Sequence, residues 1–343
     1  MYNTRPYVRL ILVTLLLLIS ACSKKSQEAQ IIDPVTAKQP TKILYITSVG
    51  WFHDYQQQVK TISKSINQFV DADIDVIVGD IDYLKANDFS KGYDLLIYNF
   101  CHAAQRDDKL IKKLMSPVVD EGKPLIALHC AMHSFQYSPE WPIFLGLKTL
   151  RHEQERSFDV KKVSNHKLTD DMPDTWTLSS DELYITLEQA ETTIPLLQSF
   201  GVETQKQHTQ AWLYQSGKGQ VIGTTLGHNE STLTDEKFQQ FLVNSIHFLI
   251  DTDQLDLTKS TRNLSLNVLT KSVTYPDKAE KQCVIHNMFA IGGEKVKACI
   301  AKQCVESSMI AECTAQCQKD NPWPVPESLR EACQKNQLTV PNL

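Results

Sequence analysis

The chain has no excess of positive charge, no internal repeat and no low-complexity tract. Its 35 Lys and Arg residues are outnumbered by 40 Asp and Glu residues, and the formal net charge is -5. A generally basic surface is therefore excluded, and we expect no nucleic-acid partner. Beyond the N-terminal region, no apolar stretch is long enough to span a membrane. The hydrophobic content of 42% instead predicts a folded body.

The start of the chain has the pattern of an export signal. Arg5 and Arg9 precede an apolar run over residues 10–19, which is too short for a spanning helix and is followed by small residues before Cys22. This ending resembles the bacterial lipobox, in which the cysteine becomes the lipidated first residue of the mature chain. We therefore expect residues 1–21 to be a lipoprotein signal peptide. An uncleaved signal anchor is the alternative.

The same resemblance implies a location for the mature protein. Ser23, in place of aspartate, implies the outer membrane, with a palmitate-type lipid on Cys22 as the membrane contact and a periplasmic or surface-facing body. Residues 22–40 are polar and show neither a helical nor a strand period. We expect them to form a flexible, lipidated tether.

The middle of the chain alternates between short apolar runs and amphipathic runs. This pattern is typical of an α/β fold with a doubly wound, mainly parallel sheet that is covered on both faces. The second half of this region is richer in strands and closes with a helix over 236–250. Strands are predicted at 42–48, 74–78, 93–99, 124–129, 157–163, 195–200, 210–214 and 220–225, with earlier helices at 57–70 and after Asp107. The α/β domain is predicted to cover 41–250, followed by a polar linker at 251–276 and a small helical domain at 277–343.

The last part of the chain is rich in cysteine and poor in apolar residues. An oxidising location and an even number of cysteines predict disulfides, which a small domain needs when its core is thin. If two helices pair as a hairpin, their cysteines would form a nested ladder, because spacings of four and five keep each pair near one helix face. The expected bridges are Cys304–Cys313, Cys299–Cys317 and Cys283–Cys333. A protein partner for this domain is the default expectation.

Histidines follow several of the predicted strands. The carboxyl ends of parallel strands share one edge of a sheet, and ligands bind in the crevice beyond that edge. We therefore expect a functional cleft that is lined by imidazoles, which bind borderline metals and transfer protons near neutral pH. The histidines are His53 after the first strand, His102 after the third, His129 and His133 after the fourth, and His228 after the last. His152, His166 and the pair Asp181-Glu182 lie in intervening loops.

With these residues in place, the chain from about Lys42 to Ile250 resembles the trehalose-utilisation (ThuA-like) family, which has the class I glutamine-amidotransferase-like fold. No single motif is specific, but their order over two hundred or so residues is. The residues that carry the resemblance are Gly50 with His53, Leu128-His129-Cys130-Ala131, Trp141 before Gly146, His152, His166, Asp181-Glu182-Leu183-Tyr184, Trp212, and Gly217-Lys218-Gly219 leading to Gly227-His228.

The resemblance implies a carbohydrate-active hydrolase, lyase or isomerase whose substrate is a sugar or a keto-sugar. It also implies that a divalent ion, zinc or manganese, could be held among the histidines, for which His53, His129 and His152 are the expected ligands. Without a metal, the same histidines could move protons beside a carbonyl. The catalytic candidates are His129, Glu182 and His228. The candidates for substrate binding are Trp51, Asp181, Tyr184 and Trp212, with core packing as the alternative for Trp212.

Three alternatives remain open at this point. A glutamine-amidotransferase nucleophile at Cys130 is disfavoured, because Leu128 and Met132 occupy positions where a strand-to-helix elbow needs small residues. Cys101 and Cys130 follow strands that should be adjacent, so they could be a disulfide or two independent buried thiols. Finally, the scaffold could serve a lipoprotein that binds a glycan, or joins an assembly, without catalysis.

Overall fold

A computed structural model describes residues 39–79, 81–250, 266–270, 275–303, 310–335 and 337–338. The described residues from Pro40 onward belong to one compact unit. The predicted signal peptide, Cys22 and nearly all of the predicted tether lie outside the described residues. Among the described helices, none is both long and apolar enough to cross a membrane.

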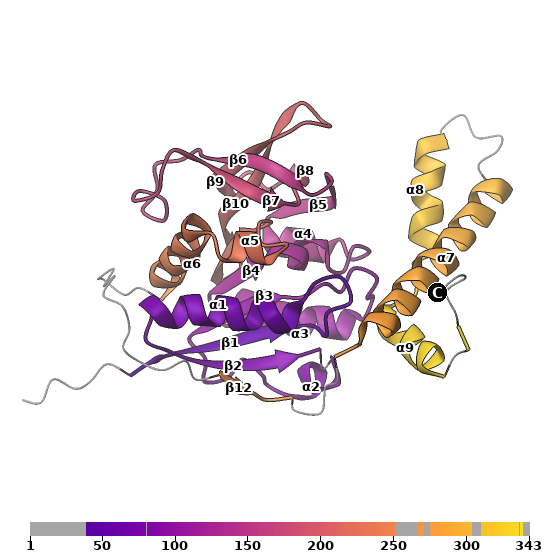
Figure 1. Ribbon diagram of the computed structural model, residues 1–343, viewed down its shortest axis with the longest axis horizontal. Helices are drawn as coiled ribbons and strands as arrows, with labels where there is room; N and C mark the ends of the chain where they lie inside the picture. Colours follow the sequence, from indigo (N-terminus) through magenta and orange to yellow (C-terminus); the bar gives the residue numbers. More distant parts are fainter. Residues whose placement is uncertain are drawn as a thin grey trace, which may run out of the picture. The chain divides into compact units, whose positions relative to one another are not determined.

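A ten-stranded mixed sheet forms the centre of this unit (Figure 1). Its parallel part has the order β12-β2-β1-β3-β4-β11. These strands are β1 (Thr41–Thr47), β2 (Ala72–Val78), β3 (Leu95–Asn99), β4 (Leu125–Leu128), β11 (Gly219–Thr224) and β12 (Leu266–Val268). Every residue of β3 and β4 is buried, as expected for strands that are covered on both faces. The predicted α/β class and mostly parallel sheet are confirmed.

The side chains of strand β1 pack alternately into two apolar cores, one on each face of the sheet. Ile43 and Tyr45 of β1 belong to one apolar cluster, whereas Leu44 and Ile46 belong to the other. The first cluster contains side chains of α1 (Tyr55–Phe69) and α6 (Glu236–Leu249), and the second contains side chains of α2 (Ile81–Ala86), α3 (Asp108–Val119) and α4 (Glu140–Leu145). This alternation is what a doubly wound sheet requires, because strand side chains point to opposite faces with a period of two.

The predicted helix starts have identifiable caps. The Asp107 carboxylate accepts a hydrogen bond from the Leu110 amide at 3.0 Å, as the sequence predicts for α3. The Asp54 carboxylate caps α1 in the same way, with the Gln57 amide as donor at 3.1 Å. The second cap fixes where the loop after β1 ends, and this loop carries His53.

The other part of the sheet is antiparallel. It continues from β11 through β10 (Lys206–Ser216), β9 (Ile194–Gly201) and β6 (Arg156–Lys162) to β7 (Thr175–Asp181). A separate two-stranded sheet pairs β5 (Leu147–His152) with β8 (Tyr184–Gln189). The sequence pattern predicts β6, β9, β10 and β11, whereas the regions of β5, β7 and β8 are expected from it to be loops. Because β5, β7 and β8 end in polar or acidic residues near the cleft, the site depends on elements that the sequence pattern missed.

The C-terminal region is helical, with α7 (Lys278–Gln303), α8 (Ile310–Asp320) and α9 (Pro326–Gln334). Disulfides join Cys283 to Cys333 and Cys299 to Cys317, which confirms two rungs of the predicted ladder. Cys313 is also disulfide-bonded, whereas Cys304 lies outside the described residues. Part of the predicted linker joins the main sheet, since β12 pairs with β2.

Two adjacent glycines in α7 provide a matched test of the packing in this region. A methyl group at Gly292 would collide with the Trp323 indole, which also packs edge-on against Phe289 at 4.6 Å, whereas a methyl group at Gly293 would meet nothing within 4 Å. We expect Gly292→Ala to lower the free energy of unfolding by about 1–3 kcal/mol through overpacking. Gly293→Ala should raise it by about 0.5–1 kcal/mol, because alanine loses less backbone entropy in a helix. Denaturant unfolding of both variants tests this, and equal effects would show that Trp323 does not pack on α7.

Candidate active site

Three histidines from different strand ends meet at one edge of the sheet. His53 lies in the loop between β1 and α1, His129 begins the 3-10 helix η1 (His129–His133) after β4, and His228 follows β11. Their ring centroids lie 4.8 Å apart for His53 and His129, 5.0 Å for His53 and His228, and 5.3 Å for His129 and His228. The predicted convergence of strand-end histidines is therefore present. His102 does not join it, because its ring packs against Phe100 at 5.0 Å.

His129 occupies a tight turn between strand and helix. Its φ is +46°, in the left-handed region that a residue with a side chain rarely adopts. Its Nδ1 lies 2.7 Å from the Thr225 carbonyl oxygen, to which it donates a proton. That bond leaves Nε2 as the ring nitrogen that faces the other site residues.

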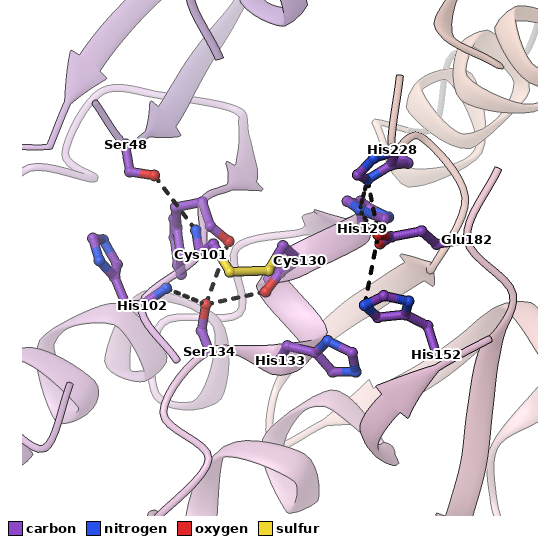
Figure 2. Close-up of a disulfide and its surroundings, with 12 residues drawn as sticks. Ser48, Cys101, His102, His129, Cys130, His133, Ser134, His152, Glu182 and His228 are labelled. Atoms are coloured by element: carbon purple, nitrogen blue, oxygen red, sulfur yellow. Dashed lines mark hydrogen bonds and ion pairs between the residues drawn. A yellow bond between two sulfur atoms is a disulfide. The ribbon is translucent and has the colours of Figure 1, made fainter. Parts of the chain in front are cut away.

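The carboxylate of Glu182 lies at the centre of the site (Figure 2). Its Oε2 is 3.4 Å from His129 Nε2 and 3.2 Å from His228 Nδ1, and its Oε1 is 3.6 Å from His152 Nε2. Burial opposes ionisation of this side chain. The hydrogen bonds and charges of His129, His228 and His152 outweigh that effect and hold the pKa of Glu182 well below its ordinary value. Glu182 is therefore a carboxylate in the folded protein.

The charge of Glu182 acts in turn on its partner. Burial lowers the pKa of His228, but the hydrogen bond and charge of Glu182 outweigh burial, so the net pKa is raised. His53 behaves differently. Burial, followed by the neighbouring imidazoles, holds the pKa of His53 well below 6.5, so this ring is neutral. The pKa values of these two neighbouring rings are therefore shifted in opposite directions.

Asp181 links the backbone segments that carry Glu182 and His228. Its carboxylate accepts hydrogen bonds from the backbone amides of Gly227 at 2.9 Å, His228 at 3.1 Å and Glu182 at 2.7 Å. The side chain is fully buried, and burial raises its pKa. Asp181 does not line the pocket. Its predicted contact with substrate is therefore replaced by a positioning role, in which it ties the end of β7 to the loop after β11.

A stack of aromatic rings forms a second wall of the site. The Tyr184 ring stacks on His133 at 4.0 Å and on His152 at 5.4 Å, and its hydroxyl lies 3.4 Å from His129 Nε2. Burial raises the pKa of Tyr184 well above 10, so its hydroxyl keeps its proton and can donate it in a hydrogen bond. His152 lies beside Glu182, and its Nδ1 donates to the Glu153 carbonyl at 2.9 Å.

Three histidines are placed to bind a metal ion, and two of them belong to the predicted ligand set. The ligand atoms of His53, His129 and His228 all lie within 4.8 Å of one another. His228 thus completes the group in place of His152, which contacts Glu182 instead. Sequence order cannot distinguish the two, because His152 reaches the cleft through β5, one of the elements that was not predicted.

The two predicted tryptophans do not line the pocket. Trp212 is completely buried in the core beside α4, donates its Nε1 proton to the Leu145 carbonyl at 2.8 Å, and covers Gly223. Trp51 is 4% exposed and lies under the Arg330 guanidinium at 5.7 Å. Both are packing residues in this structure, which corrects their predicted role as substrate platforms.

One acidic residue near the site was missed by the sequence analysis. Glu155 Oε2 lies 3.9 Å from His228 Nε2, on the side of the ring that faces away from Glu182. Its other oxygen accepts from Ser180 Oγ at 2.6 Å and from Asn229 Nδ2. The only sequence signal was a second glutamate shortly after His152. At 3.9 Å the two groups are too far apart for a hydrogen bond, so Glu155 acts on His228 through its charge, which helps to raise the pKa of the ring.

The pocket beside these residues has a volume of about 1490 Å³. Its polar lining includes His53, His133, His152, Glu182 and His228, and Cys101 and Cys130 also line it. These two cysteines form a disulfide. The open alternative is thereby settled in favour of the bridge, and the bridged Cys130 offers no thiolate for glutamine-amidotransferase chemistry.

The buried His133 predicts a specific loss of stability in acid. Burial lowers its pKa to about 3, whereas in an unfolded chain the pKa is about 6.5. Above pH 6.5 both states are neutral, so the group does not affect stability there. As the pH falls below 6.5 the unfolded chain binds the proton first, so stability is lost down to about pH 3.

We therefore expect both proteins, after treatment with a chelator, to lose stability when the pH is lowered from 7 to 5. The loss in free energy of unfolding should be about 2 kcal/mol smaller in His133→Gln than in the unmodified chain. The exposed His286 provides the control, since His286→Gln should keep the original pH dependence. Urea unfolding at both pH values measures this. Only the difference in unfolding free energy between the two pH values is compared, so a constant loss of stability from removing the Tyr184 stack cancels. Identical pH dependence in all three proteins would contradict the prediction.

Comparison with known proteins gives a family. The family model described as trehalose utilisation (ThuA) matches residues 42–249. No curated protein matches the chain. Among solved structures, a ThuA-like protein from Parabacteroides merdae is similar at 16% sequence identity with a TM-score of 0.54, covering 65% of this chain and 96% of that one. A glutamine amidotransferase from Thermotoga maritima is similar at 12% identity with a TM-score of 0.39, covering 62% of this chain and 100% of that one. The matched segment includes more than half of the chain and all the histidines of the site, and the protein belongs to the trehalose-utilisation (ThuA) family.

Proposed function

We propose that this protein is a carbohydrate-active enzyme, a hydrolase, lyase or isomerase that acts on a sugar or keto-sugar by acid/base chemistry assisted by one divalent metal ion. One observation carries the proposal. Three histidine ligand atoms lie within 4.8 Å of one another, and a carboxylate contacts two of the three rings. Titratable groups that gather beside a pocket in this way are typical of a catalytic site.

The residues fit a zinc or manganese ion. In its neutral form, His129 directs the lone pair of Nε2 toward a Glu182 oxygen at 3.4 Å. Two lone pairs at that distance repel each other unless a proton or a cation lies between them. His53 adds a buried Nδ1 that has no hydrogen-bond partner among the described residues. His53, His129 and His228 would hold the ion, which when bound would polarise a carbonyl oxygen or lower the pKa of a water molecule.

The protein's own groups supply the proton transfers. Glu182 is ionised and is the general base in this proposal. His152 lies beside it and is partly exposed, so it can pass a proton between Glu182 and solvent. The Tyr184 hydroxyl remains protonated and can donate a hydrogen bond to an oxygen on which negative charge develops. These roles suit a step that removes or adds a proton beside a carbonyl.

The size of the pocket and the family support a sugar as the substrate class. About 1490 Å³ exceeds the usual range of roughly 300–1000 Å³ for small-molecule sites, so a disaccharide fits. Acid and base groups line this pocket together with apolar side chains such as Met132, Phe135 and Leu147. That combination suits a sugar ring, which has both polar groups and an apolar face.

Metal content and turnover test the proposal together. The Ser23–Leu343 form should bind about one zinc or manganese ion per chain, as a three-histidine site implies. His53→Ala, His129→Ala and His228→Ala should each weaken metal binding at least ~10-fold, whereas the exposed His286→Ala should not. Glu182→Gln should keep the metal but reduce turnover of a keto-disaccharide by about 10²–10⁴-fold. Metal content by mass spectrometry and product formation on keto- and unmodified disaccharides are the measurements.

The outcomes separate the two functional classes. Metal-free protein that turns over no sugar but binds glycans would favour the alternative, a binding or assembly lipoprotein on the same scaffold. Metal binding that survives all three histidine substitutions would contradict the proposed ligand set.

We also propose that the mature chain is anchored to the outer membrane by lipid on Cys22. This rests on the sequence pattern at residues 1–22. Cells that express the full chain should incorporate labelled palmitate into it and retain it in the membrane fraction. Cys22→Ser should abolish the label and the processing, whereas Ser23→Ala should alter neither. Unlabelled, fully soluble wild-type protein would refute the anchor.

A further inference from the structure

A second group of potential metal ligands shares one residue with the histidine cluster. A ring nitrogen of His53 and the sulfur atoms of Cys101 and Cys130 lie within 4.8 Å of one another. All three side chains are buried, with exposed fractions of 8% for His53, 9% for Cys101 and 4% for Cys130. In the described state the two sulfurs are bonded to each other, so this group holds no thiolate. One imidazole nitrogen and two thiolates are a ligand set that zinc prefers.

The disulfide is not the only link between the two cysteine-bearing turns (Figure 2). The Ser134 hydroxyl accepts a hydrogen bond from the His102 amide at 2.9 Å. It also lies 3.3 Å from the Phe100 carbonyl oxygen and 3.2 Å from that of Cys130, either of which can accept its proton. In addition, the Phe135 amide donates to the His102 carbonyl at 3.0 Å. These bonds do not involve sulfur, so they would keep the two thiols close together after reduction.

His53 supplies an independent reason to expect a ligand at this place. Its Nδ1 is buried and has no hydrogen-bond partner among the described residues. A buried ring nitrogen without a partner is costly, and the usual explanation is an ion or water that completes it. His53 belongs to both groups, since a ring nitrogen lies within 4.8 Å of the ligand atoms of His129 and His228 and a ring nitrogen lies within 4.8 Å of the two sulfurs.

We propose that reduction of the Cys101–Cys130 bridge creates a second metal site from His53 and the two thiols, which competes with the three-histidine site for His53. The ligand is a borderline divalent cation such as zinc. In the oxidised protein His53 is available to His129 and His228. In the reduced protein it joins two sulfur ligands, so the three-histidine site loses a member.

The chemistry requires a dithiol reductant, which can reach the bridge because Cys101 and Cys130 both line the pocket. One thiolate of the reductant attacks a sulfur of the bridge and forms a mixed disulfide, and its second thiol resolves it. Two electrons and two protons pass to the protein, giving two cysteine thiols, and the reductant leaves as its own disulfide. When the two thiols bind the cation, they release two protons to solvent.

The experiment uses cobalt(II) as the probe, because thiolate ligation gives it charge-transfer bands in the near ultraviolet that histidine ligation does not. The essential variant is His228→Ala, which breaks the three-histidine site but leaves the second group intact. Treating this variant with a dithiol should increase its cobalt affinity at least ~10-fold and produce the thiolate bands. In the wild-type chain, the same bands should appear on reduction and disappear after alkylation of the thiols.

Two controls assign the bands to this site. A variant with Cys101→Ser and Cys130→Ser retains the cysteines of the C-terminal region, so any bands that persist in it would come from those cysteines and would overturn the proposal. The bands should also be lost in His53→Ala. Peptide mapping with alkylation must show that Cys101 and Cys130 are reduced. The proposal would be overturned if the dithiol fails to reduce the Cys101–Cys130 bridge in the folded protein. It would also be overturned if mapping shows that both thiols are free and no thiolate bands appear.

The proposal shares His53 with the proposed function but does not depend on it. If the three-histidine site binds no metal, the reduced His228→Ala protein should still bind cobalt through sulfur. If the second site fails, metal binding by oxidised wild-type protein is unaffected. The two failures are therefore distinguishable.

Discussion

The candidate site depends on the hydrogen bond between His129 Nδ1 and the Thr225 carbonyl. This bond joins the turn after β4 to the end of β11, two strands that pair in parallel. It fixes which ring nitrogen carries the proton, and so it determines that Nε2 faces Glu182, His228 and the Tyr184 hydroxyl. His129 holds this position with a left-handed backbone, which is the kind of local strain that clusters at functional sites.

A second constraint connects the parallel and antiparallel parts of the sheet. Glu182 follows β7, at the far edge of the antiparallel part, yet it reaches histidines that follow β4 and β11. Asp181 makes this possible, because one buried carboxylate binds backbone amides on both sides. An anion with three amide donors is stabilised where an isolated charge would not be. The loop after β11 and the acidic turn after β7 are thereby held in one arrangement.

The parts of the structure that could be predicted are those governed by short-range patterns. The buried parallel strands are continuous apolar runs, and parallel strands place their carboxyl ends at one edge, so the meeting of His53, His129 and His228 followed from strand order. The pairing Cys299–Cys317 followed from helical periodicity. The strands β5, β7 and β8 could not be predicted in this way, because mixed polar residues form strands there only through pairing with distant partners. The choice between His152 and His228, and the existence of Glu155 as a neighbour of His228, depended on those strands.

The identity of the residue in the strand-to-helix turn limits what chemistry the site can do. In a glutamine amidotransferase such a turn presents a thiolate, which forms a covalent bond to its substrate. Here the turn presents His129, and the next residue, Cys130, is occupied by a disulfide. An imidazole with its Nδ1 proton committed to a carbonyl offers a lone pair, which can accept a proton or bind a cation. The neighbouring Glu182 carboxylate favours both, since a positive charge between the two groups is stabilised from each side. The residue in this turn is therefore suited to proton transfer or cation binding, which is the chemistry proposed above, and not to covalent catalysis through a thiolate.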